Sequence, residues 1–572
     1  MRALWMVTLV GSLALLSGGC NGGGADAKEE GDDDDDTSGD DDDATGDDDD
    51  DDTSGDDDDD DDDTSGDDDD DDDDTVLLVL SAPEVVYGLA NVDNEDDWRN
   101  EDPSDNDLVV LTIQPSETPA DSIRLTVLDT QDVRAYYDGA LVIDDGRDET
   151  ITFPWQPDPV DLAIEFGEFD VDGQLLIEEL DGNGDVVATA QTRLRSAPLL
   201  LNHHLQPAEH VMSTALDFGY ADNDAFIATY ESVLGKDFES ANGFAYGFDP
   251  WMQDEFEFAT GYLPNGEHMD TVIDSIRDRG LDDFAEDRWQ GEDFGVLEFS
   301  PVAYPNSLDS FGNLEVAPPV DDYPFGRIYY GAVAVYGPND QKLFDYLEDM
   351  ALQDPFEVNT YWLCVGHVDE FVTFIPDSTA PRGFRMLFTD THAAWSVLES
   401  MDPSTPLPRY SGRFNHDYDT VGELLADQGL RDENDDLQDD YLDPIRQQMI
   451  DELGLLPEEV VLFPGIFEQA GYYCGGTVAA LIPGMVNLVV TDFGGTTQLF
   501  MADPFLRSNL GDQASDEMIS YVDSILPAGI ETYYLDDWDI YHLALGEVHC
   551  GSNVVRTPSF EDWWTNDIGG SN

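Results

Sequence analysis

The stretch "SAPLLLNHHLQP" (residues 196–207) separates two different patterns of residues. Before it, residues 76–195 hold short apolar runs such as "DLVVLTI" and "SIRLTVLD", with Gly, Asp and Pro between them. Short β-rich runs separated by turn residues at regular spacing are typical of an antiparallel β-sandwich. We therefore predict one β-sandwich domain over residues 76–195.

After the stretch, residues 196–572 alternate strand-like runs with segments of helical periodicity, such as "NDAFIATYESVLG" and "YLDPIRQQMIDELG". This alternation predicts a mixed α/β domain. The domain contains neither a G-x-x-x-x-G-K-[ST] loop nor a Rossmann glycine pattern, so nothing in it indicates nucleotide chemistry.

Aspartate dominates residues 32–74, in runs of five, four, six, eight and eight separated by Thr-Ser-Gly or Ala-Thr-Gly. Such runs repel one another and offer no apolar side chains for a core, so residues 21–75 are predicted to be a disordered linker. Without these 31 aspartates the formal charge is still −77, compared with −108 for the whole chain. A surface this acidic argues against nucleic acid as a partner.

The first 20 residues are typical of a lipoprotein signal peptide. The apolar run from Ala3 to Leu16 follows Arg2, is short for a membrane span, and ends in "SGGC". Small residues followed by Cys20 resemble a bacterial lipoprotein signal, which implies a lipid anchor on Cys20 in the cell envelope, facing the periplasm or the exterior. Ordinary secretion is the alternative.

Three cysteines remain after Cys20: Cys364, Cys474 and Cys550. Three is an odd number, so in an oxidising compartment at least one thiol is free or pairs outside the chain. A small buried hydrophobe is an adequate interpretation of Cys364 and Cys474. A Cys364–Cys474 disulfide is another, and the spacing does not decide between them.

Acidic residues and histidine gather in "PWMQDEFEF" (250–258), "VGHVDEFVTF" (365–374) and "GEVHCGSN" (546–553). On a strand, Gln253, Glu255 and Glu257 would face one way and Asp254 the other. A strand would likewise project His367 and Asp369 together.

These segments resemble the peptidylarginine deiminases, in the same order along the chain. The matching stretches are "WMQDE.E", "DSFGNLEV.PPV", "VGHVDEF.TF.P", "MVN" and "YH...GEVHCG.NV", and the likeness extends over most of residues 76–572. The resemblance implies an immunoglobulin-like β-sandwich followed by a five-bladed α/β propeller of the guanidine-modifying superfamily. Only one immunoglobulin-like domain has room here, where family members often carry two.

The resemblance implies that Asp254, His367, Asp369 and Cys550 are catalytic, and their chemistry agrees. Two carboxylates can grip a planar guanidinium. The thiol of Cys550 can attack the guanidinium carbon, and the positive charge of the bound group would lower the thiol pKa. His367 can protonate the departing ammonia. The implied reaction converts peptidyl-arginine to peptidyl-citrulline through a covalent thiouronium.

A polypeptide substrate is implied by "DSIRDRGL" (274–281), where Arg277 and Arg279 match family arginines that touch peptide carbonyls. Trp251 matches the residue that walls the aliphatic stem of the substrate arginine. Pro250 stands where the family usually has Arg, so the peptide groove is expected to differ.

Calcium is the cofactor that the resemblance implies, because hard oxygen ligands lie where the family binds metal. Asp278 replaces a usual Asn, and Asn91 and Asp93 in the acidic loop 91–107 could hold further calcium. The first site would use Gln253, Glu257 and Glu315 with the carbonyls of Phe311 and Leu314; the second would use Glu255, Asp274, Ser275 and Asp278.

Two other functions fit the same residues. A hydrolase of small guanidino compounds would use the same four catalytic side chains and would differ at Arg277, Arg279 and Trp251. A surface protein that binds calcium but has lost catalysis is the other alternative. Retention of every expected catalytic residue favours the protein-arginine deiminase.

Overall fold

The computed structural model describes a single unit whose chain begins at residue 79. The predicted signal segment, Cys20, the aspartate linker and all of the loop 91–107 except Asn91 lie outside the described residues. The described ranges are 79–91, 108–144, 149–291, 294–299, 305–332, 337–350, 352–413, 417–471, 474–558 and 562–565.

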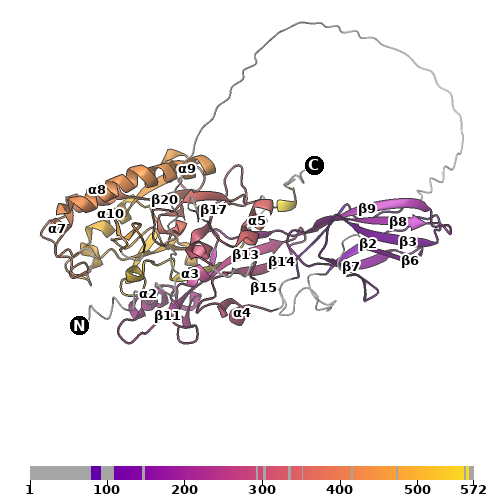
Figure 1. Ribbon diagram of the computed structural model, residues 1–572, viewed down its shortest axis with the longest axis horizontal. Coiled ribbons are helices and arrows are strands. Elements are labelled where there is room, and N and C mark those ends of the chain that lie inside the picture. The colour runs from indigo at the N-terminus through magenta and orange to yellow at the C-terminus, as the bar shows by residue number, and fades with distance from the viewer. Residues whose placement is uncertain are drawn as a thin grey trace, which may run out of the picture. The chain divides into compact units, whose positions relative to one another are not determined.

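Two sheets with a common core form the first part of the described chain (violet in Figure 1). One has the order β1-β9-β8-β3-β6 and the other β2-β7-β4-β5. Alternate residues such as Ile123, Leu125 and Val127 are fully buried between them, as the period of two in the sequence predicts. The strands are β1 (Val85–Gly88), β2 (Val109–Ile113), β3 (Ser122–Leu128), β4 (Val133–Tyr137), β5 (Ala140–Ile143), β6 (Thr150–Pro154), β7 (Val160–Phe166), β8 (Asp172–Leu180) and β9 (Val186–Ser196).

The rest of the described chain repeats one unit five times. In each unit two antiparallel strands are followed by at least one helix and then by a third strand parallel to the second. The strand triplets are β13 (Phe256–Tyr262), β14 (His268–Asp274) and β15 (Phe294–Leu297); β16 (Leu314–Ala317), β17 (Arg327–Ala332) and β18 (Phe356–Asn359); β19 (Val372–Pro376), β20 (Phe384–Asp390) and β21 (Val460–Pro464); β24 (Val489–Thr491), β25 (Gln498–Ala502) and β26 (Glu531–Leu535); and β27 (Ser552–Arg556), β11 (Ala208–Ala215) and β12 (Phe238–Asn242).

Helices connect the second and third strands of every unit, because a parallel pair requires a crossover. The longest connection carries several helices, drawn in orange in Figure 1. A short strand, β10 (Leu199–Leu201), extends the first sheet by pairing with β13. Two others, β22 (Phe467–Gln469) and β23 (Val478–Ala480), form a separate two-stranded sheet. The helices are α2 (Asp224–Leu234), α3 (Met252–Glu255), α4 (Phe284–Arg288), α5 (Gln341–Met350), α6 (Thr391–Ser400), α7 (Val421–Ala426), α8 (Gln428–Leu437), α9 (Asp443–Leu453) and α10 (Glu517–Ile525).

Strand burial follows from this layering. All six residues of β17 and all five of β25 are buried, which agrees with mixed sheets covered on both faces. The fifth unit joins distant parts of the sequence, since β27 near the C-terminus pairs with β11. Within the described residues, no helix has the length and apolar character needed to cross a membrane.

Packing of α6 against its neighbours should make a measurable contribution to stability. Leu398 is fully buried there, whereas Leu462 on β21 is 41% exposed. Replacing Leu398 by Ala should lower the free energy of unfolding by about 2–5 kcal/mol, because it removes buried methyl groups and leaves a cavity. The matched change Leu462→Ala should cost less than about 1 kcal/mol. Denaturant unfolding of both variants tests this, and equal losses would contradict the assigned burial.

Candidate active site

The residues that border the candidate site occupy the same place in all five repeated units. Each lies two or three positions before the first strand of its unit: Asp254 before β13, Gly312 before β16, Asp369 before β19, Asn487 before β24 and Cys550 before β27. Five chain segments far apart in the sequence therefore meet at a common site, where four supply a side chain and the fifth, at Gly312, leaves space.

Asp254 lies on α3, a single helical turn, and not on a strand as predicted. The predicted alternation of Gln253, Asp254 and Glu255 is therefore wrong; all three are buried, and only Glu257 lies on β13. The turn is tied to the thiol segment, because the backbone N–H of Gln253 donates to the carbonyl of Cys550 at 3.3 Å.

Asn487 holds the segment that carries the thiol. Its Oδ1 accepts from the backbone N–H groups of His549 (2.9 Å) and Cys550 (3.2 Å), and its Nδ2 lies 3.3 Å from Cys550 Sγ. The sulfur also lies 3.6 Å from Asp369 Oδ2. We did not predict a role for Asn487; its place before β24 in the repeated unit is the signal that could have revealed it.

His367 precedes a 3₁₀ turn, Val368–Glu370, so the predicted strand at this point is also wrong. The Glu370 side chain fixes the turn by accepting from the backbone N–H of His367 at 2.9 Å. His367 Nε2 lies 2.8 Å from the carbonyl of Ser307, and since a carbonyl only accepts, that nitrogen carries a proton. The other nitrogen, Nδ1, faces Asp254 Oδ1 at 3.6 Å.

Gly312 leaves the space in which these groups meet. A Cβ atom added to it would lie 2.7 Å from His367 Nδ1 and 3.1 Å from both Asp254 Oδ1 and Asp369 Oδ2. A side chain here would collide with the His367 imidazole and crowd both carboxylates. The glycine is therefore required by the close approach of the chain to the site.

Several polar atoms around this space have no hydrogen-bond partner among the described residues: Asp254 Oδ1, Asp369 Oδ1 and His367 Nδ1. All three side chains are at least nine-tenths buried. Buried polar atoms are almost always hydrogen-bonded, so this arrangement indicates a ligand that supplies positive charge and N–H donors. A guanidinium has both properties.

The surroundings of Cys550 disfavour its thiolate form when no ligand is bound. Burial, followed by the charges of Asp369 and Asp254, raises the pKa of Cys550 well above its usual value. His549 lies 2.9 Å from Asp369 Oδ2. Burial opposes protonation of His549, but Glu315 and Asp369 outweigh it and raise the pKa of this imidazole.

Comparison with known proteins agrees with this arrangement. Residues 186–565 match the family model described as protein-arginine deiminase. The chain belongs to the protein-arginine deiminase family. It is 32% identical to protein-arginine deiminase type-1 of Mus musculus over 398 residues, which are 66% of this chain and 57% of that protein. It is 30% identical to type-4 of Homo sapiens over 393 residues, 65% of this chain and 56% of that protein.

The chain thus spans a little over half the length of these deiminases. The likeness expected over most of residues 76–572 is found from residue 186 onward. Residues 76–185, with the first eight strands, precede the matched region.

The two arginines that we predicted to contact a peptide substrate, Arg277 and Arg279, contact the chain itself in this structure. Arg279 pairs with Asp254 Oδ2 at 3.3 Å and Glu255 Oε2 at 3.1 Å, and Arg277 is buried and bonded to Ser310 Oγ. Trp251 packs its ring against Gly546, where a Cβ would collide with the indole. Arg279 therefore occupies one oxygen of Asp254 and leaves the other facing the gap at Gly312.

Two residues of the second predicted calcium group, Glu255 and Asp274, have buried carboxylate oxygens that could bind a cation. Burial is the main cause that raises the pKa of Glu255 to about 7 and that of Asp274 to about 9. Glu255 Oε1 and Asp274 Oδ1 have no hydrogen-bond partner among the described residues. Ser275 Oγ donates to the carbonyl of Asp309 at 3.0 Å, and Asp278 is exposed. The buried carboxylate oxygens are the hard ligands that calcium prefers.

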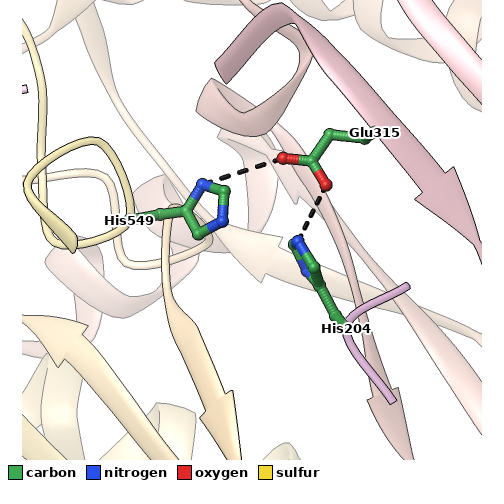
Figure 2. A group of neighbouring side chains, drawn as sticks. All are labelled: His204, Glu315 and His549. Carbon is green, nitrogen blue, oxygen red and sulfur yellow. Dashed lines mark ion pairs between the residues drawn. The ribbon is translucent and has the colours of Figure 1, made fainter. Parts of the chain in front are cut away.

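The first predicted calcium group contains nitrogen as well as oxygen. Gln253 Nε2 donates to Glu257 Oε2 at 2.9 Å. Burial raises the pKa of Glu257 well above its usual value and raises the pKa of Glu315 to about 8. Two imidazoles that we did not predict, those of His204 and His549, lie beside Glu315 (Figure 2). Phe311 opens the 3₁₀ turn Phe311–Asn313, and Leu314 is the first residue of β16. The N–H of Leu314 donates to the carbonyl of Phe311.

Cys364 and Cys474 form a disulfide with their Cα atoms 5.3 Å apart. Both are half-buried, so their interpretation as small buried hydrophobes is wrong. Cys550 is the free cysteine among the described residues, and it is buried.

Alkylation of the thiol should show its raised pKa. Because the pKa of Cys550 lies well above its usual value, the thiolate fraction is small near neutral pH, and the rate of reaction with iodoacetamide should keep rising beyond about pH 8.5, where a free thiol is half ionised. The label on the Cys550 peptide is quantified by mass spectrometry against the urea-denatured protein. A native profile that matches the denatured one would contradict this environment.

Proposed function

We propose that this protein is a hydrolase that converts the guanidinium of an arginine residue in a polypeptide into the ureido group of citrulline, with release of ammonia. One observation carries the proposal: the thiol of Cys550, two carboxylates and an imidazole nitrogen converge on the space beside Gly312. The family relationship supports the same reaction class.

Substrate binding would satisfy the unpartnered atoms of the site. The guanidinium N–H groups would donate to Asp254 Oδ1 and Asp369 Oδ1, two buried carboxylate oxygens that have no hydrogen-bond donor among the described residues. The planar group would then lie with its central carbon toward Cys550 Sγ, which already contacts Asp369. Arg279 holds the second oxygen of Asp254 and thereby fixes the orientation of this carboxylate.

The first chemical step forms a bond between Sγ and the guanidinium carbon. The positive charge of the substrate offsets the two carboxylates that disfavour the thiolate, so the thiol loses its proton to water when the substrate is bound. Attack by the thiolate breaks the C=N double bond and gives a tetrahedral adduct. Asn487 Nδ2, 3.3 Å from Sγ, orients the sulfur.

Collapse of the adduct requires a proton on the departing nitrogen. His367 is positioned to provide it from Nδ1, because Nε2 is engaged by the Ser307 carbonyl. The C–N bond breaks, ammonia leaves, and the carbon remains attached to sulfur as a thiouronium. The neutral imidazole then takes a proton from water, whose oxygen attacks the same carbon. Cleavage of the C–S bond regenerates the thiol and leaves citrulline.

Calcium is part of the proposal. The fitting ligands are Glu255 and Asp274, with Glu257 and Glu315 as a second acidic pair. A bound calcium ion would supply positive charge that neutralises these carboxylates and orders α3, which carries Asp254.

Two structural proposals accompany this function. The five repeated units support a closed five-bladed propeller, in which the fifth unit combines β27 from the end of the domain with β11 and β12 from its beginning. The two facing sheets support an immunoglobulin-like domain. The lipid anchor at Cys20 and a place in the cell envelope remain predictions, since they concern residues outside those described.

Activity of the full chain should depend on Cys550. A blocked arginine peptide incubated with calcium should release ammonia and gain citrulline, and Cys550→Ala should reduce both to background, because no other group can form the covalent adduct. His392→Gln, a change at a half-exposed surface histidine, should retain the parent rate. Ammonia release and mass spectrometry of the peptide are the measurements.

Activity in Cys550→Ala would show that the nucleophile is assigned wrongly. A folded parent protein that is inert at every calcium concentration would favour the calcium-binding surface protein, and release of ammonia only from free arginine or agmatine would favour the small-guanidino hydrolase.

Removal of a buried calcium ligand should raise the calcium requirement. Asp274→Asn takes away a carboxylate that is 6% exposed, so the calcium concentration for half-maximal activity should rise by at least about tenfold. Asp278→Asn, at an exposed position, should have a smaller effect. Calcium titrations of both full-length variants compare positions 274 and 278 in chains that carry the same aspartate-rich linker. Identical titrations for the parent and Asp274→Asn would contradict the assignment.

A further inference from the structure

We propose that His204, Glu315 and His549 form a binding site for a late first-row divalent cation, with Zn²⁺ as the best-suited ion. The site goes beyond the proposed deimination, and it uses an imidazole, that of His204, for which the reaction has no use.

The donor atoms already lie close together (Figure 2). His204 Nε2 is 2.8 Å from Glu315 Oε2, and His549 Nδ1 is 3.7 Å from Glu315 Oε1. One ligand atom from each of the three residues lies within 4.8 Å of the other two, and the two imidazole rings are 4.9 Å apart between centroids. Metal–ligand bonds of about 2.0–2.2 Å place neighbouring ligand atoms at separations of this order.

Glu315 is a buried carboxylate with one unsatisfied oxygen. Its side chain is 4% exposed, and Oε1 accepts no hydrogen bond from any described residue. An ion that bridged this oxygen and the two ring nitrogens would satisfy it. The three ligands leave one tetrahedral position, the usual arrangement of an open zinc site.

The orientation of His204 is fixed from outside the cluster. Its Nδ1 lies 3.1 Å from the hydroxyl of Thr373, so Nε2 is directed at Glu315. Histidines that ligate metals almost always use their second ring nitrogen in this way. His549 is held by its backbone, whose N–H donates to Asn487 Oδ1 at 2.9 Å.

The donor set selects against calcium. Calcium takes oxygen ligands, whereas neutral imidazole nitrogen suits zinc, copper, nickel and iron. Two nitrogens and one carboxylate therefore favour a late transition metal at Glu315, although this glutamate was predicted to be a calcium ligand. The two ions would compete for the same carboxylate.

Metal binding would disturb the catalytic centre. His549 Nδ1 lies 2.9 Å from Asp369 Oδ2, and a carboxylate only accepts, so this bond requires a proton on Nδ1. A metal ion requires the lone pair of the same nitrogen, so Nδ1 cannot bond to Asp369 and to an ion at the same time. Asp369 contacts Cys550 Sγ at 3.6 Å. Occupation of the site should therefore inhibit the proposed deimination by releasing a carboxylate that positions the substrate.

The direct test uses Co²⁺ as a coloured substitute for Zn²⁺ in the full-length protein. Binding at the proposed site should give the strong visible absorption of four-coordinate cobalt at one equivalent, and one equivalent of Zn²⁺ should remove it. The aspartate runs provide only oxygen ligands, which leave cobalt six-coordinate and weakly coloured. Weak colour alone in the parent protein would overturn the proposal without any variant.

Variants locate the site. His204→Asn should weaken zinc binding by at least about 100-fold, since even the loss of an outer hydrogen bond to a ligand costs about 10–100-fold. His268→Asn, which removes a half-exposed imidazole elsewhere, should leave the cobalt spectrum unchanged. An unaltered spectrum in a folded His204→Asn protein, or in His204→Gln if the first variant fails to fold, would overturn the assignment.

The consequence for catalysis has a separate measurement. With calcium present, Zn²⁺ should inhibit ammonia release by the parent and by His268→Asn. The same Zn²⁺ concentrations should leave His204→Asn active. The rate of each protein is compared with its own rate without zinc. Equal inhibition of all three would contradict the coupling to Asp369. If the parent releases no ammonia at all, the proposed function fails, while the cobalt spectrum still decides the metal site.

Discussion

The structure depends on one electrostatic constraint: several carboxylates are buried close together with too few donors to satisfy them. Asp254, Glu255, Asp274, Glu315 and Asp369 are all less than a tenth exposed. Moving an ionised carboxylate out of water costs several kcal/mol unless a counter-ion is near. Within the chain Arg279 supplies part of this charge, by pairing with Asp254 and Glu255. A guanidinium, calcium or another metal ion would supply the rest, so the same constraint supports both the proposed substrate and the proposed cofactor.

The repeated architecture explains how these groups come together. Each of the five units begins with a strand whose entry segment reaches the common site, where four segments supply a side chain and the fifth leaves space. The backbone bends sharply at these entries: α3 and the turn Val368–Glu370 each replace the start of a strand. Each segment leads directly into a strand of a sheet, which holds it in place. The site side chains are therefore positioned more precisely than they would be on long loops. Gly312 shows how tight the convergence is, because even a methyl group would not fit.

Sequence analysis identified the residues with distinctive chemistry and misjudged their local backbone. Cys550, His367 and the two aspartates stand in short motifs whose residue types match guanidine chemistry. The strands predicted around Asp254 and His367 are turns, because alternation of polar and apolar residues has the same appearance in a buried turn as in a half-buried strand. The Cys364–Cys474 disulfide was left undecided, since a sequence separation of 110 residues carries no distance. Asn487 and His204 were missed because asparagine and histidine are common residues and only their neighbours in space give them a role.

By itself the sequence determined that a β-rich segment precedes a mixed α/β segment. It also showed that the latter carries a thiol, a histidine and paired carboxylates in motifs that resemble those of the protein-arginine deiminases. Periodicity and composition are local properties, so the chain alone reveals them. Tertiary structure decided which of these groups share a space, that Arg277 and Arg279 turn inward in this conformation, and that two imidazoles flank Glu315. The arginine contacts join residues 24 and 33 positions apart, whereas the contacts of Asp369 with His549 and Cys550 join residues 180 and 181 positions apart. None of these contacts exists until the segments have packed.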